Sequence, residues 1–224
     1  MRAVCRGLAW PSGPAWKRAL AAGILASAIV LLLLACTGSP PEILDASLRP
    51  LYVRDPLAET IEGRLRLFVR ATDPDGEDDF AVLFLIHDGA ELYWTLQRSQ
   101  WTRSETQGET WFGSYALRLP EGIAIPTGSY RILLQDLSGE VTEVERWIDP
   151  PKPDSLNFPV SPPGRLPVLS PGDEIWAYAI DGTFLGRRTR EALEPVFWNG
   201  VSSYYLYRFD ESNTVDLLTG PYQR

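Results

Sequence analysis

The stretch GRLRLFVRA, Gly63 to Ala71, decides the fold class of this chain. Every second residue from Leu65 onward is aliphatic, and the residues between them are a phenylalanine and arginines. A period of two places one set on each face of a β-strand, so that the aliphatic face is buried and the other is wet. The pattern therefore predicts a strand from a sheet that is covered on one side.

The chain on either side of this stretch continues the strand pattern. Asp73–Asp79 reads DPDGEDD, in which the proline and glycine favour a turn. Phe80–His87 reads FAVLFLIH and is almost continuously apolar, as expected of a central strand. Other segments with strand character are Glu42–Leu48, Glu91–Leu96, Thr110–Leu119, Ser129–Asp136 and Glu140–Ile148. Because no long segment has a helical period, the sequence predicts an all-β chain.

Two longer stretches resemble bacterial immunoglobulin-like and fibronectin-type domains. ATDPDGEDDFAVLFLI, Ala71 to Ile86, is similar to the loop between their second and third strands, and IPTGSYRILLQDLSGEVTEVERWI, Ile125 to Ile148, resembles their final hairpin. The resemblance implies an Ig-like β-sandwich over residues 42–149, in which the Tyr130 hydroxyl bonds back to the chain. The cysteines of antibody domains are absent from this part of the sequence, so antibody-type adhesion is not implied.

The chain beyond residue 149 has two parts. Residues 150–167 contain seven prolines, which fix φ and remove donors, so this segment is predicted to be a stiff linker or a packed strap. Residues 168–224 contain a hairpin pattern and two later strand patterns, and are predicted to form a small β-rich C-terminal domain. So short a segment has little core of its own. It is expected either to pack against the first domain or to form an incomplete sandwich.

The N-terminus has the three parts of a secretory signal. Residues 1–18 carry four positive and no negative side chains, and residues 19–35 carry no charge. Leu33-Leu34-Ala35-Cys36 resembles the lipobox of bacterial lipoproteins, whose cysteine sulfur receives a diacylglycerol, after which the preceding peptide is cleaved and the new N-terminus is acylated. The resemblance implies a signal peptide over 1–35, a lipid on Cys36 and a lipidated tether over 36–41. An uncleaved N-terminal helix is the alternative.

Charge restricts the partners of the remaining chain. After Cys36 there are 17 basic and 29 acidic side chains, a net charge of -12, which argues against nucleic acid and against anionic lipid as a binding surface. Thr37 stands where an aspartate would resemble an inner-membrane retention signal. We therefore expect a lipid anchor in the outer membrane rather than the inner one, with the body in the periplasm or at the cell surface.

Acidic residues in the turn after Gly63–Ala71 form one candidate site. Closely spaced aspartates around a glycine supply oxygen ligands to calcium in many loops. The candidate ligands are Asp73, Asp75, Asp78 and Asp79. The EF-hand pattern is absent, and a solvated acidic turn is the alternative. Calcium is the only ion that the sequence suggests, and the only other attached group expected is the lipid on Cys36.

Three tryptophans, Trp94, Trp101 and Trp111, form the second candidate site. Exposed indoles could stack on sugar rings or form a patch for a partner, whereas buried ones would fill the sandwich. His87 is the only histidine, and a lone histidine at a strand end is expected to be structural. Motifs for nucleophilic, zinc-dependent or phosphate chemistry do not occur in the sequence.

These observations predict a non-enzymatic, membrane-anchored envelope lipoprotein that binds an unidentified protein or glycan, or has a structural role. Its expected partners are the lipid bilayer, through the anchor, and that protein or glycan. The alternative is a small carbohydrate-active enzyme or a carbohydrate-binding accessory module, because two carboxylates from any part of the chain can meet in a cleft.

Overall fold

The computed structural model describes residues 38–106, 108–161, 169–189 and 195–223. The predicted signal peptide over 1–35 and the predicted lipid attachment at Cys36 lie outside the described residues. In the described ranges, the helical segments all fall short of the length and hydrophobicity that a bilayer-crossing helix needs.

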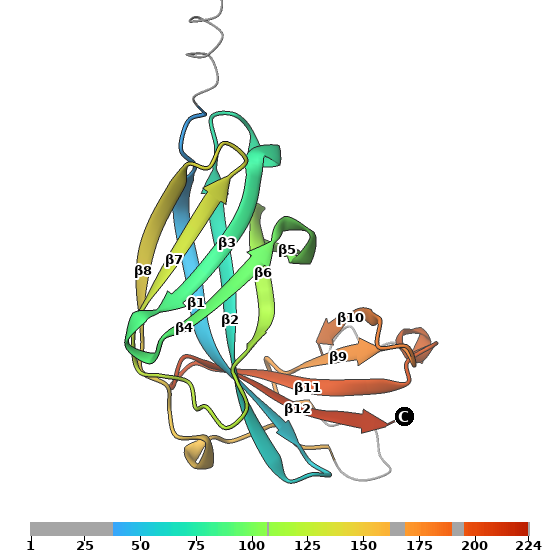
Figure 1. Ribbon diagram of the computed structural model, residues 1–224. Coiled ribbons are helices and arrows are strands. Elements are labelled where there is room, and N and C mark those ends of the chain that lie inside the picture. The colour runs from blue at the N-terminus through green and yellow to red at the C-terminus, as the bar shows by residue number, and fades with distance from the viewer. Residues whose placement is uncertain (1–37, 107, 162–168, 190–194, 224) are drawn as a thin grey trace, which may run out of the picture. The chain divides into compact units, whose positions relative to one another are not determined.

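The prediction of an all-β chain is confirmed, and the strands form two sheets (Figure 1). The larger sheet has the order β10-β9-β11-β12-β1-β2-β6-β5 and the smaller has the order β4-β3-β7-β8. The larger sheet contains β1 (Glu42–Asp55), β2 (Thr60–Thr72), β5 (Thr102–Thr106), β6 (Glu109–Arg118), β9 (Glu174–Tyr178), β10 (Phe184–Thr189), β11 (Ser203–Asp210) and β12 (Val215–Gln223). The smaller contains β3 (Phe80–His87), β4 (Leu92–Gln97), β7 (Gly128–Asp136) and β8 (Val141–Ile148). The described helical segments are short 3-10 turns: η1 (Glu77–Asp79), η2 (Asp88–Ala90), η3 (Arg98–Gln100), η4 (Pro153–Ser155) and η6 (Pro195–Trp198).

The main core lies between the smaller sheet and the β1, β2 and β6 part of the larger one. Leu65, Leu67 and Val69 of β2 are fully buried there and pack in one cluster with Leu83 and Leu85 of β3. The aliphatic face of β2 therefore lies in the core, as the alternation predicted. Each such side chain contributes about 1.5–3 kcal/mol relative to an exposed position. The prediction that the opposite face is wet is wrong, because Phe68 on that face is 3% exposed and packs edge to face on Tyr115.

Tyr130 on β7 joins this core and ties down the loop before it. Its ring is fully buried, and its hydroxyl donates a hydrogen bond of 2.9 Å to the carbonyl oxygen of Pro126. The predicted bond from Tyr130 back to the chain is confirmed. It satisfies a polar atom that would otherwise be costly to bury.

The C-terminal strands extend the larger sheet. β12 pairs in parallel with β1, from Leu51 opposite Asp216 to Arg54 opposite Thr219, and antiparallel with β11 on its other side. Val215 and Leu217 of β12 are fully buried in the sandwich core. Of the two arrangements left open for this segment, the structure has it packed against the first domain, and residues 39–224 form one compact unit.

The described part of the proline-rich segment, residues 150–161, packs as a strap on the sandwich. Phe158 is buried in the main core, and the Tyr52 hydroxyl donates a hydrogen bond of 2.8 Å to the carbonyl oxygen of Pro151. Since proline lacks a backbone donor, such a segment can cross a sheet without leaving buried N–H groups unpaired.

Candidate functional site

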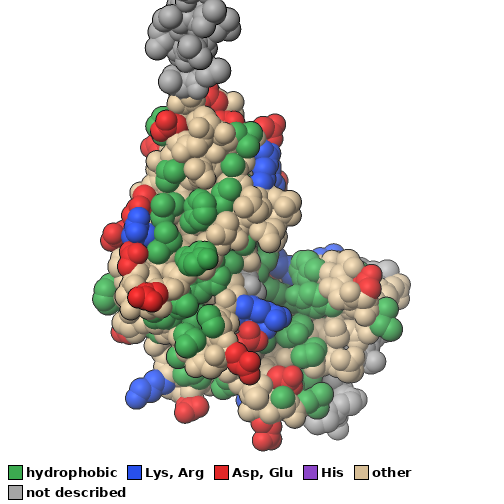
Figure 2. Space-filling model, in the orientation of Figure 1, with side chains coloured by type: hydrophobic (Ala, Val, Ile, Leu, Met, Phe, Trp, Pro, Cys, Tyr) green, Lys and Arg blue, Asp and Glu red, His purple; other side chains and the backbone are tan. Residues whose placement is uncertain are grey.

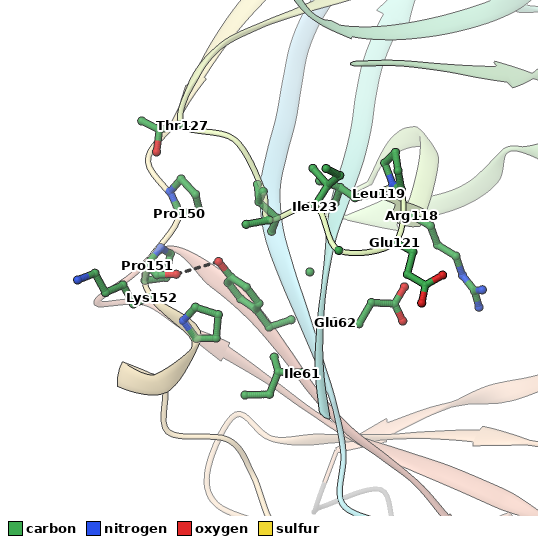
Figure 3. Close-up of a pocket in the computed structure, with 17 residues that line it drawn as sticks. Ile61, Glu62, Arg118, Leu119, Glu121, Ile123, Thr127, Pro150, Pro151 and Lys152 are labelled. Atoms are coloured by element: carbon green, nitrogen blue, oxygen red, sulfur yellow. Dashed lines mark hydrogen bonds between the residues drawn. The ribbon is translucent and has the colours of Figure 1, made fainter. Parts of the chain in front are cut away.

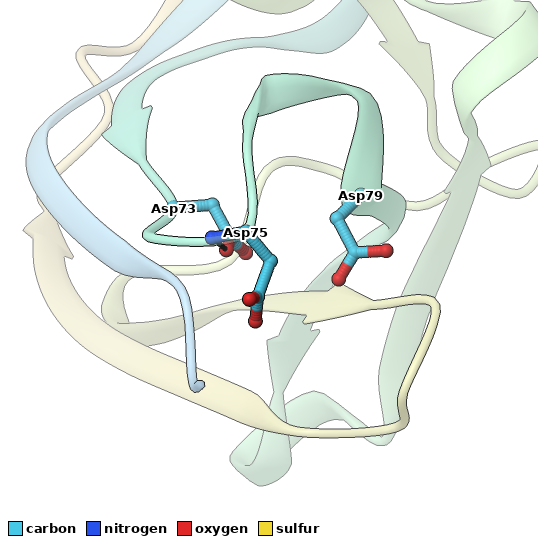
Figure 4. Close-up of side chains that lie close together, drawn as sticks. All are labelled: Asp73, Asp75 and Asp79. Carbon is cyan, nitrogen blue, oxygen red and sulfur yellow. Dashed lines mark hydrogen bonds between the residues drawn. The ribbon is translucent and has the colours of Figure 1, made fainter. Parts of the chain in front are cut away.

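The acidic loop between β2 and β3 brings three carboxylates together (Figure 4). One oxygen each from Asp73, Asp75 and Asp79 lies within 4.8 Å of the others. The Asp73 side chain helps to shape the loop, because its Oδ1 accepts a 2.7 Å hydrogen bond from the backbone N–H of Asp75. The backbone of Gly76 then turns at a φ of 107°, which glycine adopts without strain.

Asp78, the fourth predicted ligand, lies away from this group. Its side chain is 99% exposed and forms an ion pair of 2.5 Å with Arg98. Asp136 on β7 adjoins the loop instead, because the backbone N–H of the next residue, Leu137, bonds to the Asp79 carbonyl oxygen at 2.8 Å. Partial burial raises the pKa of Asp79, and the charge of Asp136 raises that pKa further.

The three predicted tryptophans do not form one platform. Trp94 and Trp101 are partly buried against the main core, and each indole N–H is bonded to a backbone carbonyl oxygen. Trp101 also stacks on Phe112, with ring centroids 4.5 Å apart. Trp111 lies on β6 next to Phe112, so its side chain points to the face of the sheet opposite the main core. The Arg70 guanidinium lies 6.0 Å from its ring centroid. Two of the rings therefore have packing roles at the edge of the sandwich.

His87 is held on both sides of its buried ring. Nδ1 accepts the backbone N–H of Ala90 at 2.9 Å, and Nε2 lies 3.3 Å from the carbonyl oxygen of Thr127. These contacts fit the tautomer that carries its hydrogen on Nε2. The ring also meets that of Tyr130 edge to face, with centroids 4.6 Å apart. These contacts give the histidine a packing role.

A hollow of about 700 Å³ opens between the β6–β7 loop and the start of the proline-rich strap (Figure 3). Ile61, Ile123 and Pro150 supply apolar walls, and Glu62 and Glu121 lie on one side of it. A hydrogen bond from Arg64 lowers the pKa of Glu62. A glycosidase acid needs a raised pKa, so Glu62 is poorly suited to that role.

A second hollow, of about 400 Å³, lies on the outer face of the larger sheet and is lined by aromatic rings. Trp176 is almost fully buried, while Tyr178 and Tyr205 are half-buried. Burial raises the pKa of both tyrosines. Arg64 also lines the hollow, and its Nε is buried without a hydrogen-bond partner. No motif in the sequence indicated this hollow, because the strand residues that line it come from six different strands.

The outer face of the smaller sheet exposes an apolar surface. The register places Val82, Phe84 and Ile86 of β3 on one face with Tyr93 and Leu133. Tyr93 is 74% exposed. Figure 2 shows hydrophobic side chains gathered over β3 and β7, with charged ones over β8. We call this surface the β3 face.

Acidic residues dominate the charged border of the β3 face. Arg131 pairs with both Glu143 and Asp88, and Glu145 lies opposite Arg131 on β8. Trp147 of β8, 70% exposed, lies opposite Ser129 on the edge strand of this sheet.

Comparison of the chain with protein-family models, curated proteins and solved structures gave no match.

Proposed function

We propose that this protein is a non-enzymatic envelope lipoprotein, anchored through Cys36, whose immunoglobulin-like sandwich binds another protein of the cell envelope through the β3 face. The lipobox-like Leu33–Cys36 supports the anchor, and the compact unit begins at Ser39, three residues after the cysteine. Several acyl chains would hold the protein firmly on a membrane, which one chain alone would not do. We propose the outer membrane as its location, because Thr37 stands where an aspartate would resemble an inner-membrane retention signal.

The observation that carries the binding role is the exposure of Tyr93, which lies opposite Ile86 beside the half-buried apolar residues of β3. Trp147, on the edge strand β8, adds a second exposed ring to the same sheet. Apolar surface of this kind stabilises a complex when a partner removes it from water. The acidic border selects for a partner whose own apolar patch is surrounded by basic residues.

The anchor is tested by replacing Cys36 with Ala in a bacterial host. The variant should lose incorporation of labelled palmitate and move from the membrane to the soluble fraction. A variant that stays with the membrane would contradict the lipoprotein assignment.

The binding surface is tested with a photo-crosslinking amino acid at Tyr93 in one strain and at Ile180 in another. Ile180 is a matched control, because it is apolar and 92% exposed but lies outside the β3 face. A discrete crosslinked product from position 93 and not from 180 is expected. Equal products from both positions, or none from 93, would contradict the proposal.

A second candidate function, a carbohydrate-binding accessory module, is favoured by the aromatic hollow beside Arg64. The half-buried rings of Tyr178 and Tyr205 can stack on the apolar face of a pyranose. Affinity electrophoresis in gels containing envelope polysaccharide would test it, with Tyr205→Ala as the impaired variant and Tyr93→Ala as the control. Equal retardation of both variants and the unaltered protein would exclude the hollow as the site.

A further inference from the structure

Two buried carboxylate oxygens lack a hydrogen-bond partner at one end of the sandwich. They are Oδ2 of Asp73 and Oδ2 of Asp136, residues that are 7% and 2% exposed. The other oxygen of Asp136 accepts the Ser138 hydroxyl and the Glu140 N–H, both at 2.8 Å. Burying an ionised oxygen without a partner is costly, and a cation bound at this end of the molecule would offset that cost.

The described residues supply no cation to these acids. The nearby arginines are engaged elsewhere: Arg98 pairs with Asp78, and Arg103 lies 4.0 Å from Glu77. Asp73, Asp75 and Asp79 form no ion pair among the described residues, although their oxygens lie within 4.8 Å of one another. Like charges at that separation repel unless a cation lies between them.

We propose that Asp73, Asp75 and Asp79 bind a calcium ion, and that Asp136 beside them adds negative charge to the site. The donor set is entirely carboxylate oxygen, which suits a hard cation and not zinc or copper. Calcium fits better than magnesium, because calcium accepts six to eight oxygens in loose geometry, whereas magnesium requires a near-ideal octahedron. Backbone oxygens and water would complete its coordination.

The site would also hold Ser39, at the start of the compact unit, in place. The backbone N–H of Ser39 donates a 2.7 Å hydrogen bond to Asp75 Oδ2. An ion that orders Asp75 therefore orders the acceptor of this bond as well. This consequence does not depend on the proposed function, since it concerns only the loop and the start of the compact unit.

The test uses the full chain in detergent, stripped with chelator and then titrated with calcium chloride. We expect a Kd of about 0.1–1 mM, as in extracellular calcium modules. The melting temperature should rise by about 3–6 °C at a tenfold excess over Kd. Calorimetric titration should give one site. Absence of a shift at millimolar calcium, or an equal shift with magnesium, would overturn the proposal.

Two asparagine variants separate ion binding from a structural role. Asp79→Asn should abolish the calcium shift but leave the melting temperature in chelator unchanged or higher, because it removes repulsion. Asp78→Asn, in the same loop but outside the cluster, should keep the full calcium shift. A lower melting temperature of Asp79→Asn in chelator, or loss of the shift in Asp78→Asn, would count against the site.

Discussion

The rings of Tyr115 and Trp176 meet edge to face with centroids 5.1 Å apart, although four strands separate β6 from β9 in the larger sheet. Neighbouring strands lie about 4.8 Å apart, so a flat sheet would separate these two strands by about 24 Å. The larger sheet therefore bends sharply across its outer face. Figure 1 shows the bend as a change of direction, with β9, β11 and β12 running across the direction of β6. The aromatic hollow lies inside this bend.

A double-mutant cycle measures this contact. Tyr115→Leu and Trp176→Leu should each destabilise the protein, and their coupling should be about 0.5–1.5 kcal/mol, the range for aromatic pairs. Urea unfolding of the four proteins gives the coupling directly. A coupling indistinguishable from zero would mean that the two halves of the sheet do not meet in solution.

The carboxylate of Asp216 is fully buried on the same face and should be essential for stability. It accepts a 2.6 Å hydrogen bond from the Tyr207 hydroxyl and lies 3.2 Å from Arg49 Nε and 3.3 Å from Arg66 Nη1. Asp216→Ala leaves two arginines without their partner and should cost about 3–5 kcal/mol. Tyr207→Phe should cost about 1.5–3 kcal/mol.

Chemical unfolding checks both values, with Glu211→Ala as the control. Glu211 is exposed in the β11–β12 turn, so its loss should change stability by less than about 0.5 kcal/mol. If Asp216→Ala is as stable as the control, the buried ion pairs have no net effect.

Alkaline pH should destabilise the protein partly through Tyr207. Burial raises the pKa of Tyr207 above its ordinary value of 10, and the adjacent charge of Asp216 raises it further. The unfolded chain therefore loses this proton first. The resulting stability is fully present below pH 10 and is lost as pH rises toward the folded-state pKa.

Replacing Tyr207 with Phe should make the decline in unfolding free energy above pH 10 shallower. The expected difference is up to about 1.4 kcal/mol per pH unit. Urea titrations at several pH values measure the two slopes. Identical slopes would show that Tyr207 has the same proton affinity in both states.

Gly113 on β6 should tolerate no side chain. A Cβ at this position would lie 2.0 Å from the carbonyl oxygen of Leu67 on β2, which is backbone and cannot move aside. Gly113→Ala should therefore cost about 3 kcal/mol or more. Gly89→Ala is the control, since its Cβ would meet nothing closer than His87 Cε1 at 3.4 Å. Thermal melts of the two variants should differ by several degrees, and similar melts would contradict the close approach of β2 and β6.

Local pattern predicted the strands whose side chains alternate or are continuously apolar, and it missed those without such a pattern. Phe80–His87 was recognised because it is almost continuously apolar, and in the structure it is an inner strand of the smaller sheet. β5 was missed because TRSET is polar, and it forms a strand only by pairing with β6 at the edge of the larger sheet. Edge strands are specified by their neighbour more than by their own composition.

The acidic site shows the same division. Asp73, Asp75 and Asp79 were found because they are close in the chain, and the turn around Gly76 brings them together. Asp78 was included for the same reason, but its side chain is exposed and pairs with Arg98 instead. Asp136 was missed because it comes from β7 and reaches the loop only when β3 and β7 pair.

The sequence by itself determined the all-β class, through a side-chain period of two, and it predicted Cys36 as the anchor, through the apolar run that ends there. Tertiary structure decided that the C-terminal strands continue the first sheet, that Asp216 pairs with Arg66 from 150 residues earlier, and that Asp136 joins the acidic loop. The reason is physical. Periodicity records which face of one strand avoids water, whereas the identity of a strand's neighbour depends on how all the faces are covered at once.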